Sequence, residues 1–130
     1  MNKIVIIEDE RMMHFIYNQL IARHSELKEI EVLSAYNYQE GIEILKTLSE
    51  SGKTDMCVLL DLDLGDGHTG WEILESGYFG DESRSKVYIC SSSSSIHDQN
   101  KALEYPVVKG YFQKPITPDA IRTIADRFLS

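Results

Sequence analysis

Polar residues that can do acid, metal or nucleophilic chemistry follow four apolar segments, each at the point where the segment ends. They are Glu8-Asp9-Glu10, the pair Asp61 and Asp63, the serine run 91–95, and Lys114. A single carboxylate at such a position is more often a solvated turn residue. The joint pattern differs, because parallel strands would bring all four groups to one edge of a sheet.

Carboxylates gathered at one edge need a cation. Two like charges about 4 Å apart repel by about 4 kcal/mol at an effective dielectric constant of 20. Carboxylate and carbonyl oxygens suit Mg²⁺, which keeps coordination positions for water or phosphate, and Lys114 adds positive charge. An aspartate there could attack a phosphoryl group while metal, lysine and a serine hydroxyl neutralise the developing charge. The product would be an aspartyl phosphate.

Apolar, β-favouring runs alternate with segments of helical length. The runs cover residues 4–7, 30–33, 56–60, 87–90 and 107–112. Because each is almost unbroken, they indicate a parallel sheet buried on both faces, with right-handed crossover helices on both sides. The predicted fold is α/β, a doubly wound five-stranded parallel sheet with five helices. Its functional crevice is expected beyond the carboxyl ends of the strands.

Periodicity and capping signals place the helices. The first has a core face with a solvated histidine near its end: Met12, Met13, Ile16, Tyr17, Leu20 and His24. The second, fourth and fifth begin at caps, which are Asn37, Ser95 and Thr117. The third is expected from Trp71 to about Phe79, and the fourth must stop by Tyr105 because Pro106 cannot continue it.

Composition restricts the class of protein. The chain has 130 residues, with 13 basic and 21 acidic side chains and a net charge of −8, so direct nucleic-acid binding is not expected. Its longest apolar runs are far below the roughly 18 residues of a membrane span, and no segment resembles a signal peptide, so a cytoplasmic location is expected. Cys57 and Cys90 lie in apolar runs and are predicted to be buried free thiols.

Four segments together resemble the signature of response-regulator receiver domains. They are Ile4-Val5-Ile6-Ile7-Glu8-Asp9-Glu10, Leu59-Leu60-Asp61-Leu62-Asp63-Leu64, the serine run after Ile89-Cys90, and Gly110-Tyr111-Phe112-Gln113-Lys114-Pro115. The resemblance spans the whole chain and implies one receiver domain over residues 1–130 without an output domain, similar to single-domain chemotaxis-Y-like regulators. It also implies the strand order 2-1-3-4-5.

The resemblance assigns a role to each matching residue. Asp61 corresponds to the phosphoacceptor, Lys114 to the lysine that pairs with the phosphoryl group, Ser91 to the switch hydroxyl and Tyr111 to the switch aromatic. Implied ligands of Mg²⁺ or Mn²⁺ are Asp9 directly, Glu8 through a water molecule, Asp61 and the backbone carbonyl of Asp63. Lys114-Pro115 corresponds to a bond that is usually cis in the family.

The same resemblance implies partners. A sensor histidine kinase or histidine phosphotransfer protein would donate the phosphoryl group, and a downstream protein would read the switched surface of the fourth helix, fifth strand and fifth helix. Nucleic acid and membrane are not expected as partners. The chain would be a monomer or a phosphorylation-dependent dimer. It would promote its own phosphorylation and dephosphorylation without being a turnover enzyme on an external substrate.

Several positions depart from the family pattern. Gly65 stands where a proline is usual, and the loop near His68-Thr69 is one residue longer than common, so this loop is expected to be mobile. Asp63 alternates with Asp61 along the chain and remains a second candidate acceptor. Within the serine run, Ser92 remains an alternative to Ser91.

Two alternatives from other classes remain. Asp61-Leu62-Asp63 also resembles the D-x-D pair of haloacid-dehalogenase-type phosphatases, although that family places the pair near its start and needs room for a substrate cap. A phosphorylation-independent interaction module or a flavodoxin-like carrier would share the architecture. Residues 8–11 form an acidic turn without the cradle that a flavin phosphate needs.

Overall fold

Within residues 1–79 and 83–130, which the computed structural model describes, five parallel strands form one sheet in the order β2-β1-β3-β4-β5. The strands are β1 (Asn2–Ile7), β2 (Glu31–Ala35), β3 (Asp55–Leu60), β4 (Ser85–Ser91) and β5 (Val108–Gln113). This confirms the predicted doubly wound α/β fold and its strand order. The predicted runs for β2 and β5 start one residue before the observed strands. The strands β1, β3 and β4 start one or two residues before their predicted runs.

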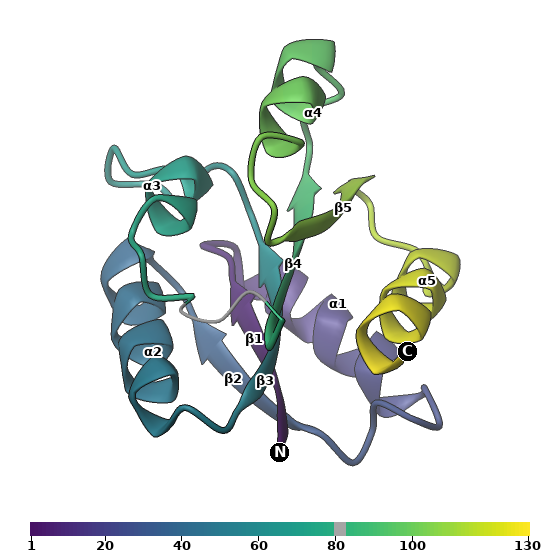
Figure 1. The fold of residues 1–130 in the computed structure, drawn as a ribbon. Helices are drawn as coiled ribbons and strands as arrows, with labels where there is room; N and C mark the ends of the chain where they lie inside the picture. Colours follow the sequence, from purple (N-terminus) through teal and green to yellow (C-terminus); the bar gives the residue numbers. More distant parts are fainter. Residues whose placement is uncertain (80–82) are drawn as a thin grey trace.

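Helices cover both faces of the sheet. They are α1 (Arg11–Ala22), α2 (Tyr38–Ser51), α3 (Gly70–Leu74), α4 (Ile96–Ala102) and α5 (Pro118–Leu129). Figure 1 shows α1 and α5 on one side of the sheet and α2 and α3 on the other, with α4 beyond the ends of β4 and β5. Right-handed crossovers between parallel strands require this two-sided arrangement.

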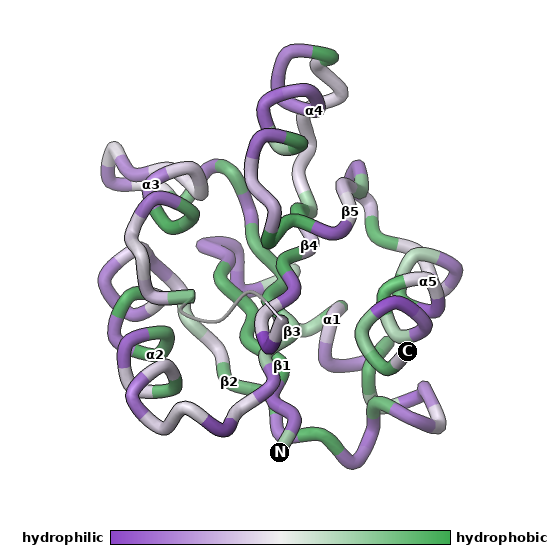
Figure 2. Tube along the Cα trace, viewed as in Figure 1, coloured by the Kyte–Doolittle hydropathy of each residue, from purple (hydrophilic) through white to green (hydrophobic). Residues whose placement is uncertain are grey.

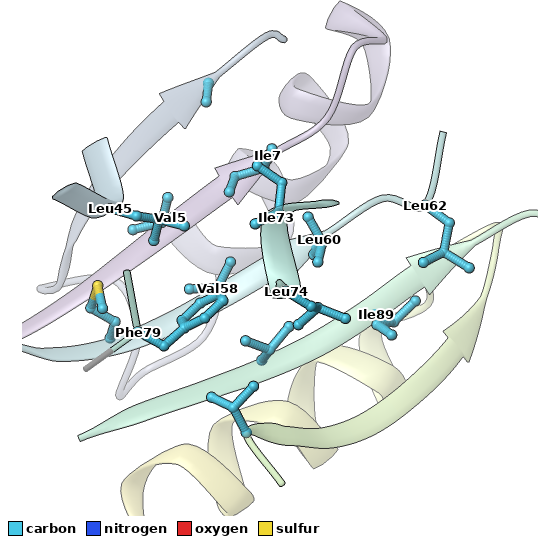
Figure 3. Packing of buried hydrophobic residues seen from close by; sticks show 14 of the residues in the cluster. Val5, Ile7, Leu45, Val58, Leu60, Leu62, Ile73, Leu74, Phe79 and Ile89 are labelled. Carbon is cyan, nitrogen blue, oxygen red and sulfur yellow. The ribbon is translucent and has the colours of Figure 1, made fainter. Parts of the chain in front are cut away.

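Alternate residues of each strand enter different cores. On β1, Val5 and Ile7 pack on the side of α2 and α3, whereas Ile4 and Ile6 pack on the side of α1 and α5. Figure 3 shows the first of these cores, with Leu45 of α2 and Ile73 of α3 against the strands. Hydrophobic residues accordingly concentrate in the strands, whereas α4 is mainly hydrophilic (Figure 2). The sheet is therefore held rigidly from both faces.

The buried face of α1 differs from the predicted one. Met12 is 67 % exposed, and the prediction that it belongs to the core is wrong. The buried residues are Met13, His14, Tyr17 and Ile21. Because Met13, Tyr17 and Ile21 are spaced four apart, they align along one stripe, and a residue adjacent in sequence is rotated about 100° away from it.

The third helix is shorter than expected, whereas the fourth ends before Tyr105 as the sequence requires. α3 ends at Leu74 and does not continue to Phe79, because the Ser76 hydroxyl donates to the Ile73 carbonyl and Gly77 has φ 81°. α4 ends at Ala102, and the amide of Tyr105 then bonds to the Ala102 carbonyl three residues back. This tighter turn leads into Pro106. The N-caps Asn37, Ser95 and Thr117 are confirmed by side-chain bonds to the first turn.

The structure also tests the predictions about the cysteines and about membrane-spanning segments. Cys57 and Cys90 are buried and free, as predicted. Among the residues that the structure describes, no helix combines the length and apolar character that a membrane span requires.

The core on the side of α2 makes a quantitative prediction. Leu45 is fully buried, so Leu45→Ala should lower the free energy of unfolding by about 2 to 5 kcal/mol through lost burial and a residual cavity. Leu103 is 81 % exposed, and the matched change Leu103→Ala should alter stability by about 0.5 kcal/mol or less. Urea unfolding measures both, and equal losses would contradict this description of the core.

Candidate functional site

The predicted polar groups meet at the carboxyl ends of the strands. Backbone hydrogen bonds extend the sheet pairing one residue past several strands: the Asp61 amide donates to the Ile7 carbonyl at 3.0 Å, and the Lys114 amide donates to the Ser91 carbonyl at 2.8 Å. The Glu8 amide donates in the same way to the Ala35 carbonyl at 3.1 Å. These bonds place Glu8, Asp61, Ser91 and Lys114 side by side at one edge, as the strand order requires.

Lys114 lies between two buried carboxylates. Its Nζ is 2.5 Å from Oε1 of Glu8 and 3.3 Å from Oδ2 of Asp61. Glu8 is 1 % exposed and Asp61 is 6 % exposed. One cation therefore serves two acids that water hardly reaches, so both acids can be ionised together only at a cost in free energy.

The protonation of these groups follows from that imbalance. Burial raises the pKa of Glu8 to about 8, against the opposing effect of the Lys114 ammonium, and the Asp61 charge raises it further. Burial also raises the pKa of Asp61, although Lys114 opposes the change. Burial alone would lower the pKa of Lys114, but its bonds to Glu8 and Asp61 outweigh burial and hold the pKa above its usual value. A divalent cation that bound these carboxylates would therefore displace a proton from them.

The acidic turn after β1 supplies further oxygen donors. One carboxylate oxygen from each of Glu8, Asp9 and Glu10 lies within 4.8 Å of the others. The Glu10 amide also donates to Oε2 of Glu8 at 3.1 Å. Hard oxygen donors from a few side chains, partly open to solvent, fit the requirements of Mg²⁺. The sequence placed all three acids at this turn and, through the family resemblance, named Glu8 and Asp9 as ligands; the structure adds a Glu10 carboxylate oxygen to the same cluster.

The two candidate acceptors have different environments. Asp61 is buried beside Lys114, whereas Asp63 is exposed and its Oδ1 accepts from the Gly65 amide at 3.1 Å. The Asp63 carboxylate therefore stabilises its own turn, and the geometry favours Asp61 as the reactive carboxylate.

The loop after Asp61 explains the glycine at position 65. Gly65 has φ 72°, which proline cannot adopt, and Asp66 and Gly67 are also left-handed. The His68 amide donates to the Gly65 carbonyl at 2.9 Å, and the His68 ring stacks on Tyr38 with centroids 4.3 Å apart. Gly65 thus marks a tight, internally bonded turn, which argues against the mobility expected from the sequence.

Gly70 is a further residue of the site that sequence reasoning missed. A Cβ at this position would lie 2.4 Å from the carbonyl oxygen of Asp61. The Gly70 amide also donates to the Leu62 carbonyl at 2.9 Å. Only glycine allows the start of α3 to approach the Asp61 backbone this closely, so Gly70 helps to fix the position of Asp61. Its close approach depends on the loop conformation, which sequence patterns do not reveal.

Burial distinguishes Ser91 from Ser92 in the serine run. Ser91 is 4 % exposed at the end of β4, and its Oγ accepts from the Ser93 amide at 3.1 Å. Ser92 is exposed. The Tyr111 hydroxyl donates to the Ser93 carbonyl at 2.8 Å, so Ser91 and Tyr111 bond to the same loop residue. Its position at the end of β4 and its burial favour Ser91 over Ser92 as the candidate switch hydroxyl.

Because two buried acids share one lysine, we expect this site to lower the free energy of unfolding. Asp61→Asn leaves Lys114 paired with Glu8 alone and removes the repulsion between two buried carboxylates, so the free energy of unfolding should rise by about 1 kcal/mol. Asp63→Asn is the matched control, because Asn keeps the acceptor for the Gly65 amide, and its effect should be within about 0.5 kcal/mol. Urea unfolding without divalent metal is the measurement, and a clear loss of stability in Asp61→Asn would contradict the prediction.

Burial of Glu8 also predicts a pH dependence. The pKa of Glu8 is about 8 in the folded chain and near its ordinary 4.5 when exposed, so the folded state retains a proton that the unfolded state loses between these values. The stability that Glu8 contributes is complete below 4.5 and declines as pH rises through about 8. Glu8→Gln, which mimics the protonated acid, should gain stability over the unchanged protein across this interval. Urea unfolding in metal-free buffers spanning it tests this, and a pH-independent difference would contradict it.

Comparisons with known proteins place the chain in a family whose members share this fold. Residues 4–126 match the response regulator receiver domain family. A two-component response regulator from Cytophaga hutchinsonii is 25 % identical, with 98 % of this chain and 96 % of that chain covered and a TM-score of 0.81. A CheY-like receiver domain protein from Methanospirillum hungatei JF-1 is 21 % identical, with coverages of 98 % and 94 % and a TM-score of 0.77.

A two-component response regulator from Clostridium difficile shares the fold at 20 % identity, with coverages of 99 % and 96 % and a TM-score of 0.78. No curated protein matches the chain. The family match spans β1 to α5 and so includes the acidic turn, Asp61, the serine run and Lys114. The chain belongs to the response regulator receiver domains of two-component systems.

Proposed function

We propose that this receiver accepts a phosphoryl group on Asp61 from a phosphohistidine of a sensor histidine kinase or a histidine phosphotransfer protein. The observation that carries the proposal is the buried Asp61 carboxylate beside Lys114 and Glu8. An Asp61 oxygen forms the new bond to phosphorus as the phosphorus–nitrogen bond to the donor imidazole breaks. The bonding electrons stay on the imidazole nitrogen, and because the other ring nitrogen of the phosphohistidine carries a proton taken from water, the donor ends as a neutral histidine.

Lys114 and Ser91 support this transfer. The Lys114 ammonium is already within 3.3 Å of Asp61, so it can stabilise charge on the transferred group without a large movement. The Ser91 hydroxyl uses its oxygen to accept from the Ser93 amide, which leaves its proton able to bond a phosphoryl oxygen.

The acidic turn would hold Mg²⁺ or Mn²⁺, with Glu8, Asp9, Asp61 and the Asp63 carbonyl as ligands. A bound divalent cation neutralises negative charge on the acids and on the phosphoryl oxygens. The turn of Glu8, Asp9 and Glu10 supports this assignment because its carboxylate oxygens gather within 4.8 Å. Glu8 must release its proton when the cation binds, since a ligand carboxylate is deprotonated.

The switch would pass through the loop between β4 and α4. When Ser91 turns to the phosphoryl group, its bond to the Ser93 amide breaks, and Tyr111 is bonded to the carbonyl of the same residue. The Ser93 hydroxyl in turn donates to Asp98 in the first turn of α4 at 2.7 Å. A change at Ser91 therefore alters α4 and β5, and with them the affinity for a downstream protein.

The alternatives have less support. A haloacid-dehalogenase-type phosphatase needs Asp63 as an acid beside Asp61, but the Asp63 carboxylate accepts from its own turn, and the family match is to receiver domains. A phosphorylation-independent interaction module would not require two buried acids around Lys114, an arrangement that opposes stability.

Phosphorylation makes the decisive prediction. Intact mass spectrometry after incubation with acetyl phosphate and Mg²⁺ should show one phosphoryl adduct that is labile in base and requires the metal. Asp61→Asn should lose the adduct, because among the described residues the other buried carboxylate beside Lys114 is that of Glu8, which is already bonded to the lysine. Lys114→Ala should give little adduct.

Asp63→Asn is the matched control and should retain the adduct. An adduct in Asp61→Asn that Asp63→Asn lacks would move the acceptor to Asp63. Absence of any adduct, including with a histidine kinase as donor, would favour the interaction module, and continuous hydrolysis of phosphate esters would favour the phosphatase.

A further inference from the structure

We propose that His14 is a positioning residue for the acidic turn, and that its imidazole N–H holds the peptide from which both Glu8 and Asp9 project. His14 is on α1 and is 3 % exposed. The inference rests on the proposed function, because it concerns the cation site of the same edge, and it assigns to this edge a residue that provides none of its ligands.

The contact that carries the proposal is a short hydrogen bond. Nε2 of His14 lies 2.7 Å from the backbone carbonyl oxygen of Glu8. A carbonyl oxygen only accepts, so Nε2 carries the proton and donates. The amide of Glu8 is held on its other side by the Ala35 carbonyl at 3.1 Å. Both backbone groups of Glu8 are therefore fixed, one by the end of β2 and the other by a side chain of α1.

Fixing this carbonyl affects two acids. The carbonyl of Glu8 and the amide of Asp9 belong to one planar peptide, so the bond from His14 sets the direction in which the chain leaves for Asp9. The side chain of Glu8 meanwhile reaches Lys114 from the same residue. Mg²⁺ requires near-octahedral geometry, and groups that orient metal ligands typically contribute 10- to 100-fold to metal affinity.

Packing alone does not explain a histidine here. The ring lies against Tyr36 with centroids 4.2 Å apart, and Arg11 lies over the Tyr36 ring at 4.3 Å. Among the described residues, Nδ1 of His14 has no hydrogen-bond partner. A phenyl ring would fill similar space without an unpaired buried polar atom, which costs stability. The donor on Nε2 is the property that an apolar ring lacks.

The test measures the affinity of the unphosphorylated full chain for Mg²⁺ alone by isothermal titration calorimetry. His14→Phe keeps a ring but loses the donor, and its affinity should fall about 10-fold or more. His14→Leu, a second variant without the donor, should fall similarly. His14→Gln carries an N–H at similar reach and should restore most of the affinity. Ile21→Val removes a methyl from the same buried face of α1, away from Glu8, and should bind Mg²⁺ like the unchanged protein.

Each negative result of the Mg²⁺ titration rules out a different proposal. If the unchanged chain binds Mg²⁺ and His14→Phe binds it equally well, the positioning role is wrong and the proposed function stands. Equal weakening in Ile21→Val and all His14 variants, with matching losses in thermal stability, overturns it as well, because the effect is then general. If the unchanged chain does not bind Mg²⁺, the cation site of the proposed function falls, and this proposal falls with it.

A measurement on the unchanged protein needs no substitution. Long-range ¹H–¹⁵N spectra of the histidine rings should show His14 protonated at Nε2, as the bond to the Glu8 carbonyl requires. A ring protonated only at Nδ1 would overturn the proposal even if the His14 variants failed to fold.

Discussion

The structure depends on one lysine that two buried carboxylates share. Lys114 contacts Glu8 and Asp61 at the edge of the sheet, and neither acid is exposed enough for water to screen it. A buried pair of acids with one cation opposes folding. The hydrophobic cores on both faces of the sheet must therefore supply stability that the site does not, and the site retains more acids than its one lysine can neutralise.

The parallel sheet makes this arrangement possible. Its carboxyl ends lie along one edge, and backbone bonds from Asp61 to Ile7 and from Lys114 to Ser91 hold neighbouring chains in register beyond the strands. Side chains that are up to 106 positions apart in sequence, such as Glu8 and Lys114, thereby meet at hydrogen-bond distance. Helices packed on the sheet then contact the backbone of individual site residues. Gly70 of α3 lies close to the Asp61 carbonyl, and His14 of α1 donates to the Glu8 carbonyl.

The same construction connects the site to the surface. Ser91 ends a buried strand, yet its hydroxyl is bonded to a loop whose next groups reach Tyr111 and the first turn of α4. α4 is mainly hydrophilic and extends beyond the sheet (Figures 1 and 2). Few apolar contacts oppose a shift of such a helix, whereas the strands beneath it are fixed by two cores. A rigid edge with a less constrained helix beside it suits the change of surface that we propose for this receiver.

The sequence by itself determined the strands, the caps and the polar groups at the strand ends, because apolar runs and capping residues act locally. It therefore predicted the fold and placed Glu8, Asp61, Ser91 and Lys114 at one edge. Alternation along a strand treats Asp61 and Asp63 alike, and the sequence preferred Asp61 only because it directly follows the apolar run 57–60 and matches the family pattern.

Tertiary structure decided what depends on contacts between distant segments. Burial beside Lys114 favours Asp61 over Asp63 as the proposed acceptor, and burial at the end of β4 favours Ser91 over Ser92 as the proposed switch hydroxyl. The exposure of Met12, the close approach of Gly70 and the role of His14 were likewise hidden. Each depends on which face of an element meets the rest of the protein, and residue type and spacing restrict that choice without making it.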